Sequence, residues 1–204
     1  MLKIPLDWCI KLTLGLAFIF LQNLSLAADT QQRPKLFVVT SVSPITNIVR
    51  NIAGTHIQVQ GIVPDGVDSH TFEPIPSDAK ILQRADLIIV NGLDLELPTI
   101  KLAEKVKKDR TPILQLGNLV LKEEEWQYDF SFPRQHGHPN PHLWLNIELV
   151  MRYVKIIEQK LIALDPVHQS SFAMNAAAYL TKLQKLDQAI LNCITTIPEN
   201  SRKL

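Results

Sequence analysis

Cysteine is scarce in this chain, and neither sign of charge is in excess. Only two of the 204 residues are cysteine, and 21 basic residues stand against 20 acidic ones. A nucleic-acid binder would show a basic excess or a basic stripe, so this balance argues against that class of partner. Cys9 precedes an N-terminal apolar run, whereas Cys193 falls in the last predicted helix. Export with cleavage would therefore leave a single cysteine and exclude an intrachain disulfide.

The sequence also lacks the short motifs of nucleotide binding and hydrolysis. It contains no P-loop, no G-x-G-x-x-G, no G-x-S-x-G and no C-x-x-C, and no repeat at a fixed period. Its composition, 46% apolar and 20% charged with few aromatics, is that of a globular protein. The length fits one ordinary domain or half of a two-domain protein.

Residues 1–27 have the organisation of a secretory signal peptide. Lys3 and Lys11 supply positive charge, residues 12–21 form an apolar run, and Ser25 and Ala27 place small residues at the expected cleavage site. The run is shorter than the ~20 residues that a membrane-spanning helix needs. The sequence therefore predicts a periplasmic protein with a cleavable signal, and an uncleaved N-terminal anchor is the alternative. Cys9 lies before the run, where it is not placed as a lipoprotein acceptor.

The next part of the chain alternates between buried strands and amphipathic helices. Apolar runs predict strands, and residues spaced by three and four predict helices between them. Ser43 is expected to cap the first helix. Such alternation indicates an α/β fold with a parallel sheet, a (β/α)4 unit whose ligand site lies at the carboxyl ends of the strands. The expected strands are 35–40, 56–63, 85–91 and 112–116, and the expected helices are 44–53, 76–84 and 96–107.

The last third of the chain is predicted to be a polar loop followed by two helices. Residues 117–141 look irregular, and a loop of ~25 residues inside a compact domain is usually functional or disordered. Residues 146–164 and 166–197 show continuous helical spacing. The second of these would be roughly 45 Å long, more than a domain of this size needs. It is expected to link one lobe to another.

Two histidines stand out as candidate metal ligands. His70 lies in the loop after the second predicted strand, and His142 lies between Pro141 and a helix start. Imidazole is the commonest metal ligand among side chains, and the topology places both loops at one edge of one sheet. Asp68 and Glu73 could accept the second ring N–H of His70 and fix its tautomer. A surface-loop histidine and a buried, hydrogen-bonded histidine are the respective alternatives.

Four other histidines carry weaker signals. His136 and His138 flank a glycine in the polar loop and form a possible auxiliary metal site, with an ordinary solvated loop as the alternative. His56 is expected to point outward from a strand, and His168 lies in the first turn of the long helix. Both are expected to be surface residues.

Three motifs in this order resemble the metal-binding receptors of bacterial ABC importers for zinc and manganese, the cluster A-I or cluster 9 solute-binding proteins. The motifs are G-V-D-S-H-T-F-E-P at 66–74, A-D-L-I-I-V-N-G-L-D-L-E at 85–96 and N-P-H-L-W-L-N at 140–146. The resemblance covers the chain from about Lys35 to its end. It implies two α/β lobes joined by one long helix, with the metal between them.

On this resemblance residues 28–165 are the N-terminal metal-binding lobe, 166–197 the interlobe helix and 198–204 the start of a second lobe that the sequence does not contain. His70 and His142 fall on the first two metal ligands of the family. The remaining ligands would come from the missing lobe. The resemblance leaves Zn²⁺ and Mn²⁺ equally open, because the ligand that most distinguishes them is not in the sequence.

The sequence thus predicts an exported receptor that binds a divalent transition metal and delivers it to an ABC transporter permease, without catalysis. Two alternatives remain at this point. An exported zinc-dependent hydrolase would need a third ligand within the chain and a general base. A surface adhesion protein would carry its histidines with no working metal site.

Overall fold

The structure is a computed structural model that describes residues 34–202. The expected signal peptide and Cys9 therefore lie outside the described residues. Within this part of the chain, no helix combines the length and the hydropathy needed to cross a bilayer.

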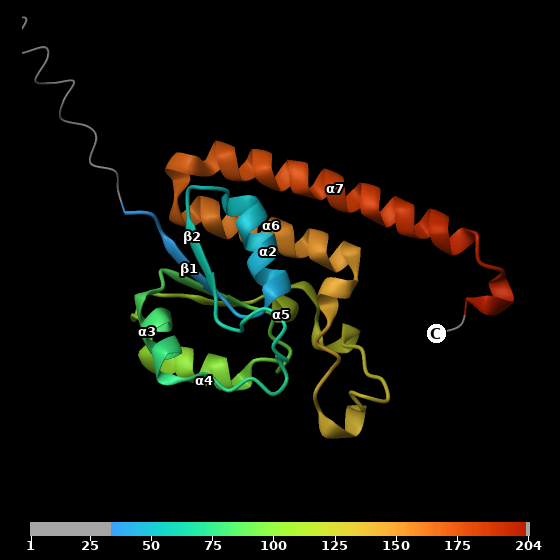
Figure 1. Cartoon of the computed structure of the whole chain (residues 1–204), viewed down its shortest axis with the longest axis horizontal. Coiled ribbons are helices and arrows are strands. Elements are labelled where there is room, and N and C mark those ends of the chain that lie inside the picture. The colour runs from blue at the N-terminus through green and yellow to red at the C-terminus, as the bar shows by residue number, and fades with distance from the viewer. Residues whose placement is uncertain (1–33, 203–204) are drawn as a thin grey trace, which may run out of the picture. The chain divides into compact units, whose positions relative to one another are not determined.

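Four parallel strands form the centre of the fold, as the alternation of strands and helices predicted (Figure 1). The order across the sheet is β2-β1-β3-β4. All residues of the two central strands are buried, whereas the two outer strands are partly exposed. Apolar side chains on both faces are typical of a parallel sheet covered by helices on both sides. The strands are β1 (Phe37–Thr40), β2 (Gln58–Gly61), β3 (Leu87–Val90) and β4 (Ile113–Gln115).

Helices cover both faces of this sheet and bury its alternating side chains. Val38 and Ile89 face a core formed with α2 (Ser43–Ala53), α6 (Ile147–Leu164) and α7 (Gln169–Thr195). Val39 and Ile88 face a smaller core on the opposite side. Residues of α3 (Pro76–Arg84) and α4 (Leu97–Val106) complete that second core. The result is a three-layer α/β unit.

Two helix starts differ from the sequence prediction. Ser43 is the first residue of α2 rather than its cap; its hydroxyl donates to the Asp65 carboxylate, and among the described residues no side chain accepts a backbone N–H at this helix start. The long helix begins at Gln169 and not at residue 166, because residues 166–168 form a 3-10 turn. In that turn His168 Nδ1 lies 2.6 Å from Asp165 Oδ2. The remaining 27 residues of α7 still give a helix of about 40 Å.

The predicted irregular stretch 117–141 contains more structure than expected. Leu116–Val120 forms a short helix, α5, and two 3-10 turns follow at Glu123–Glu125 and Arg134–His136. Gly117 allows α5 to pack closely, since a Cβ there would lie 3.0 Å from the backbone oxygen of Asn91. The prediction of an entirely irregular segment was wrong at this point.

The position of His56 also differs from the prediction. It precedes β2 instead of lying on a strand, and its ring stacks on that of His168 with centroids 4.1 Å apart. The edge of the buried Phe172 ring faces the same pair. These two histidines therefore join the α2–β2 connection to the turn between α6 and α7.

Candidate metal centre

The two histidines chosen from the sequence lie side by side in the structure. His70 is in the loop between β2 and α3, and His142 directly precedes a 3-10 turn, Leu143–Leu145, that leads into α6. Their Nε2 atoms are 3.1 Å apart, although 72 residues separate them in the chain. The topology had predicted this proximity. Two imidazole nitrogens facing each other in this way can be brought to one metal ion.

The backbone of each histidine is held by the same kind of hydrogen bond, from its N–H to a side-chain oxygen two residues earlier. Asp68 Oδ1 accepts the backbone N–H of His70 at 2.9 Å, and Asn140 Oδ1 accepts that of His142 at 3.0 Å. Asn and Asp favour such turns. Asp68 thus binds the backbone and not the ring of His70, which differs from its expected role. Glu73 is exposed, and no contact within residues 34–202 joins it to the His70 ring.

Asn140 also fixes the ring of His142, a role that the sequence reasoning missed. Its Oδ1 lies 2.8 Å from His142 Nδ1, and its Nδ2 donates to Asp129 Oδ2 at 2.6 Å. An oxygen at Asn140 requires the proton on Nδ1, so the Nε2 of His142 carries the free lone pair that faces His70. An asparagine just before a proline and two residues before a histidine was the available signal for this contact.

Electrostatics around His142 favour its neutral form, which is the form that binds metal. Burial is the main reason that the pKa of His142 is lowered, and the nearby His70 ring adds to the effect. The Asp129 carboxylate opposes it. The hydrogen bond from Asn140 in turn is the main cause that lowers the pKa of Asp129, so this group stays ionised.

Two aromatic rings lie against the pair of imidazoles. The Phe132 ring lies 5.7 Å from the His70 ring and 5.5 Å from the His142 ring, measured between centroids. Trp144 meets His142 edge-on at 5.2 Å. Nothing in the local sequence around Phe132 indicated this contact, because the loop that carries it is irregular. His70 remains exposed, so the rings cover only part of the pair.

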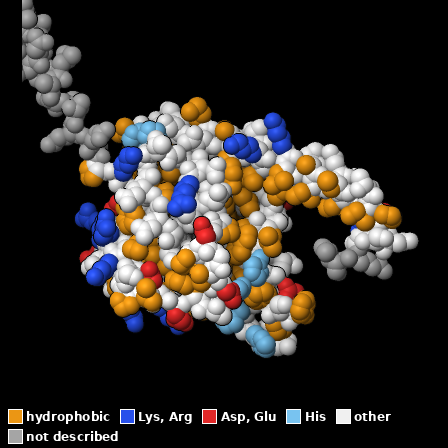
Figure 2. Space-filling view, viewed as in Figure 1, with side chains coloured by type: hydrophobic (Ala, Val, Ile, Leu, Met, Phe, Trp, Pro, Cys, Tyr) orange, Lys and Arg blue, Asp and Glu red, His pale blue; other side chains and the backbone are white. Residues whose placement is uncertain are grey.

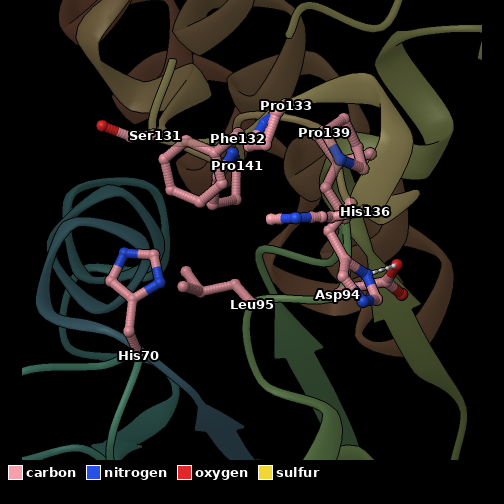
Figure 3. A pocket seen from close by; sticks show the side chains of 11 residues that line it. His70, Asp94, Leu95, Ser131, Phe132, Pro133, His136, Pro139 and Pro141 are labelled. Carbon is pink, nitrogen blue, oxygen red and sulfur yellow. Dashed lines mark hydrogen bonds and ion pairs between the residues drawn. The ribbon is translucent and has the colours of Figure 1, made fainter. Parts of the chain in front are cut away.

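A cavity of about 240 Å³ lies beside His70, and the second pair of histidines also lines it (Figure 3). His136 and His138 both line it, together with Asp94. His138 Nδ1 lies 2.9 Å from Asp94 Oδ2. Asp94 has a positive φ of 62°, which non-glycine residues adopt rarely. The possible auxiliary residues are thus brought to the same cavity as His70, and Asp94 is an addition that the sequence did not suggest.

A buried carboxylate shapes the loop that follows β3. Glu96 is 2% exposed, and its two oxygens accept the backbone N–H groups of Asn91 and Gly92 at 2.9 and 3.0 Å. The hydroxyl of Ser41 donates to the same carboxylate. Burial raises the pKa of Glu96, and these hydrogen bonds oppose the rise. The carboxylate therefore holds the ends of β1 and β3 together beneath the histidine loops.

Two imidazoles alone do not complete a metal site. Zinc usually takes four N, O or S ligands in proteins. Within residues 34–202 no group of three or more histidine, cysteine, aspartate or glutamate side chains has the geometry to hold a metal ion. The arrangement can supply two ligands from one rigid edge, and a bound ion would need others.

A comparison with known protein families agrees with the three sequence motifs around this site. The model described as zinc-uptake complex component A, periplasmic (ZnuA) matches residues 38–204. The chain belongs to the ZnuA family. This is a family of solute-binding transport proteins, as the three motifs predicted.

Several relatives of this ZnuA-family chain are metal receptors by name. It is 37% identical over 170 residues to the metal ABC transporter substrate-binding lipoprotein FimA of Streptococcus parasanguinis. The aligned region covers 83% of this chain and 55% of that protein. It is 36% identical to the manganese-binding lipoprotein MntA of Halalkalibacterium halodurans, with 83% and 53% covered. The chain thus spans about half the length of the curated relatives it matches.

Solved structures support the α/β fold with its long C-terminal helix. The periplasmic zinc-binding protein TroA from Treponema pallidum superimposes with a TM-score of 0.72 at 27% identity, over 81% of this chain and 57% of that one. The cadmium-bound periplasmic metal-binding protein from Candidatus Liberibacter asiaticus gives a TM-score of 0.65 at 32% identity, over 79% and 56%. The fold predicted from the sequence is confirmed.

Proposed function

We propose that this chain forms part of an exported receptor that captures Zn²⁺ or Mn²⁺ for uptake by an ABC transporter. The observation that carries the proposal is the pair of Nε2 atoms of His70 and His142, 3.1 Å apart at the carboxyl edge of the sheet. The names of the relatives support the same class of cargo, since they include manganese- and zinc-binding proteins. The metal is the transported substrate, and we expect no catalysis.

We propose that His70 and His142 coordinate the metal directly through neutral imidazole. The Asn140 contact supports this for His142, because it leaves Nε2 unprotonated. Two imidazoles leave the ion short of ligands, so we propose that protein outside these two loops supplies the others. We propose a matching domain organisation. Residues 28–165 form a metal-binding lobe, residues 166–197 form a linking helix, and residues 198–204 are the start of a second lobe.

We further propose that His136 and His138 are auxiliary residues that contact metal only weakly beside the main pair, because, of the residues that the structure describes, no three side chains there have the geometry to hold an ion. Both line the cavity that His70 also lines, as does Asp94. The pairing of His138 with Asp94 at 2.9 Å supports this, because the carboxylate would neutralise part of the charge of an incoming cation. Asp68 keeps a supporting role in the proposal by holding the backbone of His70, and the proposal assigns no role to Glu73.

We propose a periplasmic location, reached with a cleavable signal at residues 1–27. Several relatives are named lipoproteins, which would be anchored through a cysteine. In this chain Cys9 lies ahead of the apolar run and is not placed for lipid attachment. Mass spectrometry of the exported protein tests this, since a free N-terminus at residue 28 is expected and a lipid adduct would contradict it.

The test of the function is a chelator-competition titration of residues 28–204 with Zn²⁺ and with Mn²⁺, beside the His70→Ala/His142→Ala double variant. Binding tighter than about micromolar that the double variant loses would support the proposal. Binding that is weak and unchanged in the variant would refute metal capture by this chain and would favour the surface-protein alternative. Removal of His136 and His138 in a second variant should reduce only additional, weaker binding.

The hydrolase alternative is not part of the proposal. It needs a third protein ligand near His70 and His142, and residues 34–202 do not bring one within reach. Turnover of ester or phosphoester substrates by the zinc-loaded chain would reopen it.

A further inference from the structure

We infer that Asn91 is a positioning residue that holds His142 ready for the metal. The inference rests on the proposed function, since it assigns a supporting role at the same site. Asn91 directly follows β3 and is fully buried. Among residues 34–202 its side chain hydrogen-bonds to Gly92, Pro141 and Tyr153 and to neither histidine ring. Its role therefore has to act through the backbone of the loop that carries His142.

The side chain of Asn91 joins three separate elements by hydrogen bonds. Its Nδ2 donates to the backbone oxygen of Pro141 at 2.8 Å, directly before His142 in the chain. Its Oδ1 accepts the hydroxyl of Tyr153, a fully buried residue of α6, at 3.0 Å. The end of β3, the histidine loop and α6 are therefore tied to one amide group. Burial raises the pKa of the Tyr153 hydroxyl, so it remains a donor at ordinary pH.

The backbone of Asn91 is fixed as firmly as its side chain. Glu96 accepts the N–H groups of Asn91 and Gly92, and this contact closes the loop over residues 91–96. Leu93 and Asp94 within the loop both have positive φ, at 52° and 62°. Leucine adopts such a conformation rarely, and an arrangement that keeps it must be held by its surroundings. The loop thus gives Asn91 one orientation, with its amide towards Pro141.

The consequence for the site is that Asn91 sets the distance between His142 and His70. Pro141 is itself buried, and its carbonyl oxygen accepts two donors, the amide of Asn91 and the backbone N–H of Leu143, each at 2.8 Å. The Leu143 bond lies within the histidine loop, so Asn91 is the contact that ties this carbonyl to the end of β3 and to α6. Without Asn91 the oxygen would keep only its local partner, and the loop with His142 could shift relative to the sheet. Groups that orient metal ligands typically change metal affinity by about ten- to a hundredfold when they are removed. We expect a loss of this size for an Asn91 variant whose two histidines are intact.

The experiment compares Asn91→Leu with Thr111→Val, a matched control at the opposite edge of the sheet. Thr111 is 4% exposed, and its hydroxyl donates to the backbone oxygen of Ala85 at 2.8 Å, so its loss removes the same kind of buried bond. Zn²⁺ affinity is measured by chelator competition in residues 28–204. The ¹⁵N resonances of the histidine rings are recorded on the metal-free protein, and thermal unfolding is recorded for each variant.

Asn91→Leu should bind Zn²⁺ at least about tenfold more weakly and should lose the Nδ1-protonated signature of His142. Thr111→Val should unfold at a lower temperature but keep the wild-type affinity and ring resonances. An Asn91→Leu protein that matches the wild type in both readouts would overturn the inference, as would equal loss in the control. If Asn91→Leu does not fold, Tyr153→Phe replaces it, with a smaller loss of affinity expected and no loss refuting the role.

The ring resonances separate this inference from the proposed function. If the wild-type chain binds neither Zn²⁺ nor Mn²⁺, the proposed function fails for this chain. A metal-free His142 ring that changes in Asn91→Leu and not in Thr111→Val would still support positioning, and an unchanged ring would refute it.

Discussion

The exposed end of α7 leads to a prediction about self-association. Phe172, Ala176 and Leu183 on this helix are buried against the rest of the unit. Beyond them the apolar spacing continues into solvent, and Figure 2 shows hydrophobic side chains along this part of the helix. The α7 stripe consists of Leu186, Ile190, Leu191 and Ile194 on the helix and Ile197 just after its end, each 41–51% exposed. Leu183 is 8% exposed and is the last buried residue of the helix, so the exposed stripe begins after it.

The size of the effect follows from these exposures. Burying a fully exposed leucine or isoleucine side chain contributes about 1.5–3 kcal/mol, and the stripe exposes roughly as much as two such side chains. Covering it contributes about 3–6 kcal/mol per copy and about 6–12 kcal/mol for two copies. Association costs about 4–15 kcal/mol. Because the gain and the cost overlap, the expected result is weak, reversible pairing with a dissociation constant no lower than about 1 µM.

The assay is sedimentation velocity of residues 28–204 across a wide range of protein concentration. The wild-type chain should sediment faster as concentration rises. Ile190→Glu/Ile194→Glu should remain monomeric, because it places charge inside the α7 stripe. Val167→Glu is the control, since it adds charge at a residue that is 72% exposed but lies outside the stripe. A wild type that stays monomeric throughout, or a control that dissociates as the double variant does, would refute the reasoning.

Three further predictions concern protonation, the turn before α7 and a close contact. Metal affinity should fall as pH drops below about 6.5, because protons compete for the imidazoles. Burial lowers the pKa of His142 in the folded protein. Its contribution to the free energy of unfolding is therefore present above the ordinary histidine pKa and is lost as pH falls through the lower folded pKa. Metal affinity and unfolding free energy that both stay flat over about pH 7.5 to 5.5 would count against these two statements. His168→Ala removes the stack on His56 and should cost about 1–2 kcal/mol in urea unfolding with Zn²⁺ affinity unchanged. Gly117→Ala should cost about 1–3 kcal/mol in the same assay, because its Cβ would press on the backbone oxygen of Asn91, and a neutral result would show that α5 can shift.

The sheet could be predicted because its signals are local. Four apolar runs separated by amphipathic segments leave little choice of fold class, and the rule for parallel crossovers supplies the direction of the strands. The sequence prediction was wrong where the local residues fit two conformations equally well. Gly117 and Asn118 look like turn formers, yet they lie in α5, because the tight packing of that helix on the end of β3 decides the conformation.

In the candidate site, too, some contacts could be predicted from the sequence and others could not. The proximity of His70 and His142 followed from topology, since both loops were expected at one edge of the sheet. The contact of Asn140 with the ring could have been found from its position two residues before His142. Phe132 and Asn91 could not, because Phe132 meets His70 across 62 residues of chain and Asn91 meets Pro141 across 50. Such pairings depend on the folded backbone and leave no pattern in the neighbouring residues.

The strand order β2-β1-β3-β4 has a consequence for where a ligand of this sheet can lie. The connections leave β1 and β3 in opposite directions, so the sheet has a topological switch point between these two strands, the usual crevice for ligands in open α/β folds. Here the crevice is already filled by the protein's own polar groups, because Ser41 and Asn91 end the two strands and Glu96 bridges them. The pair of His70 and His142 therefore lies one layer further out, on the loops above these polar groups.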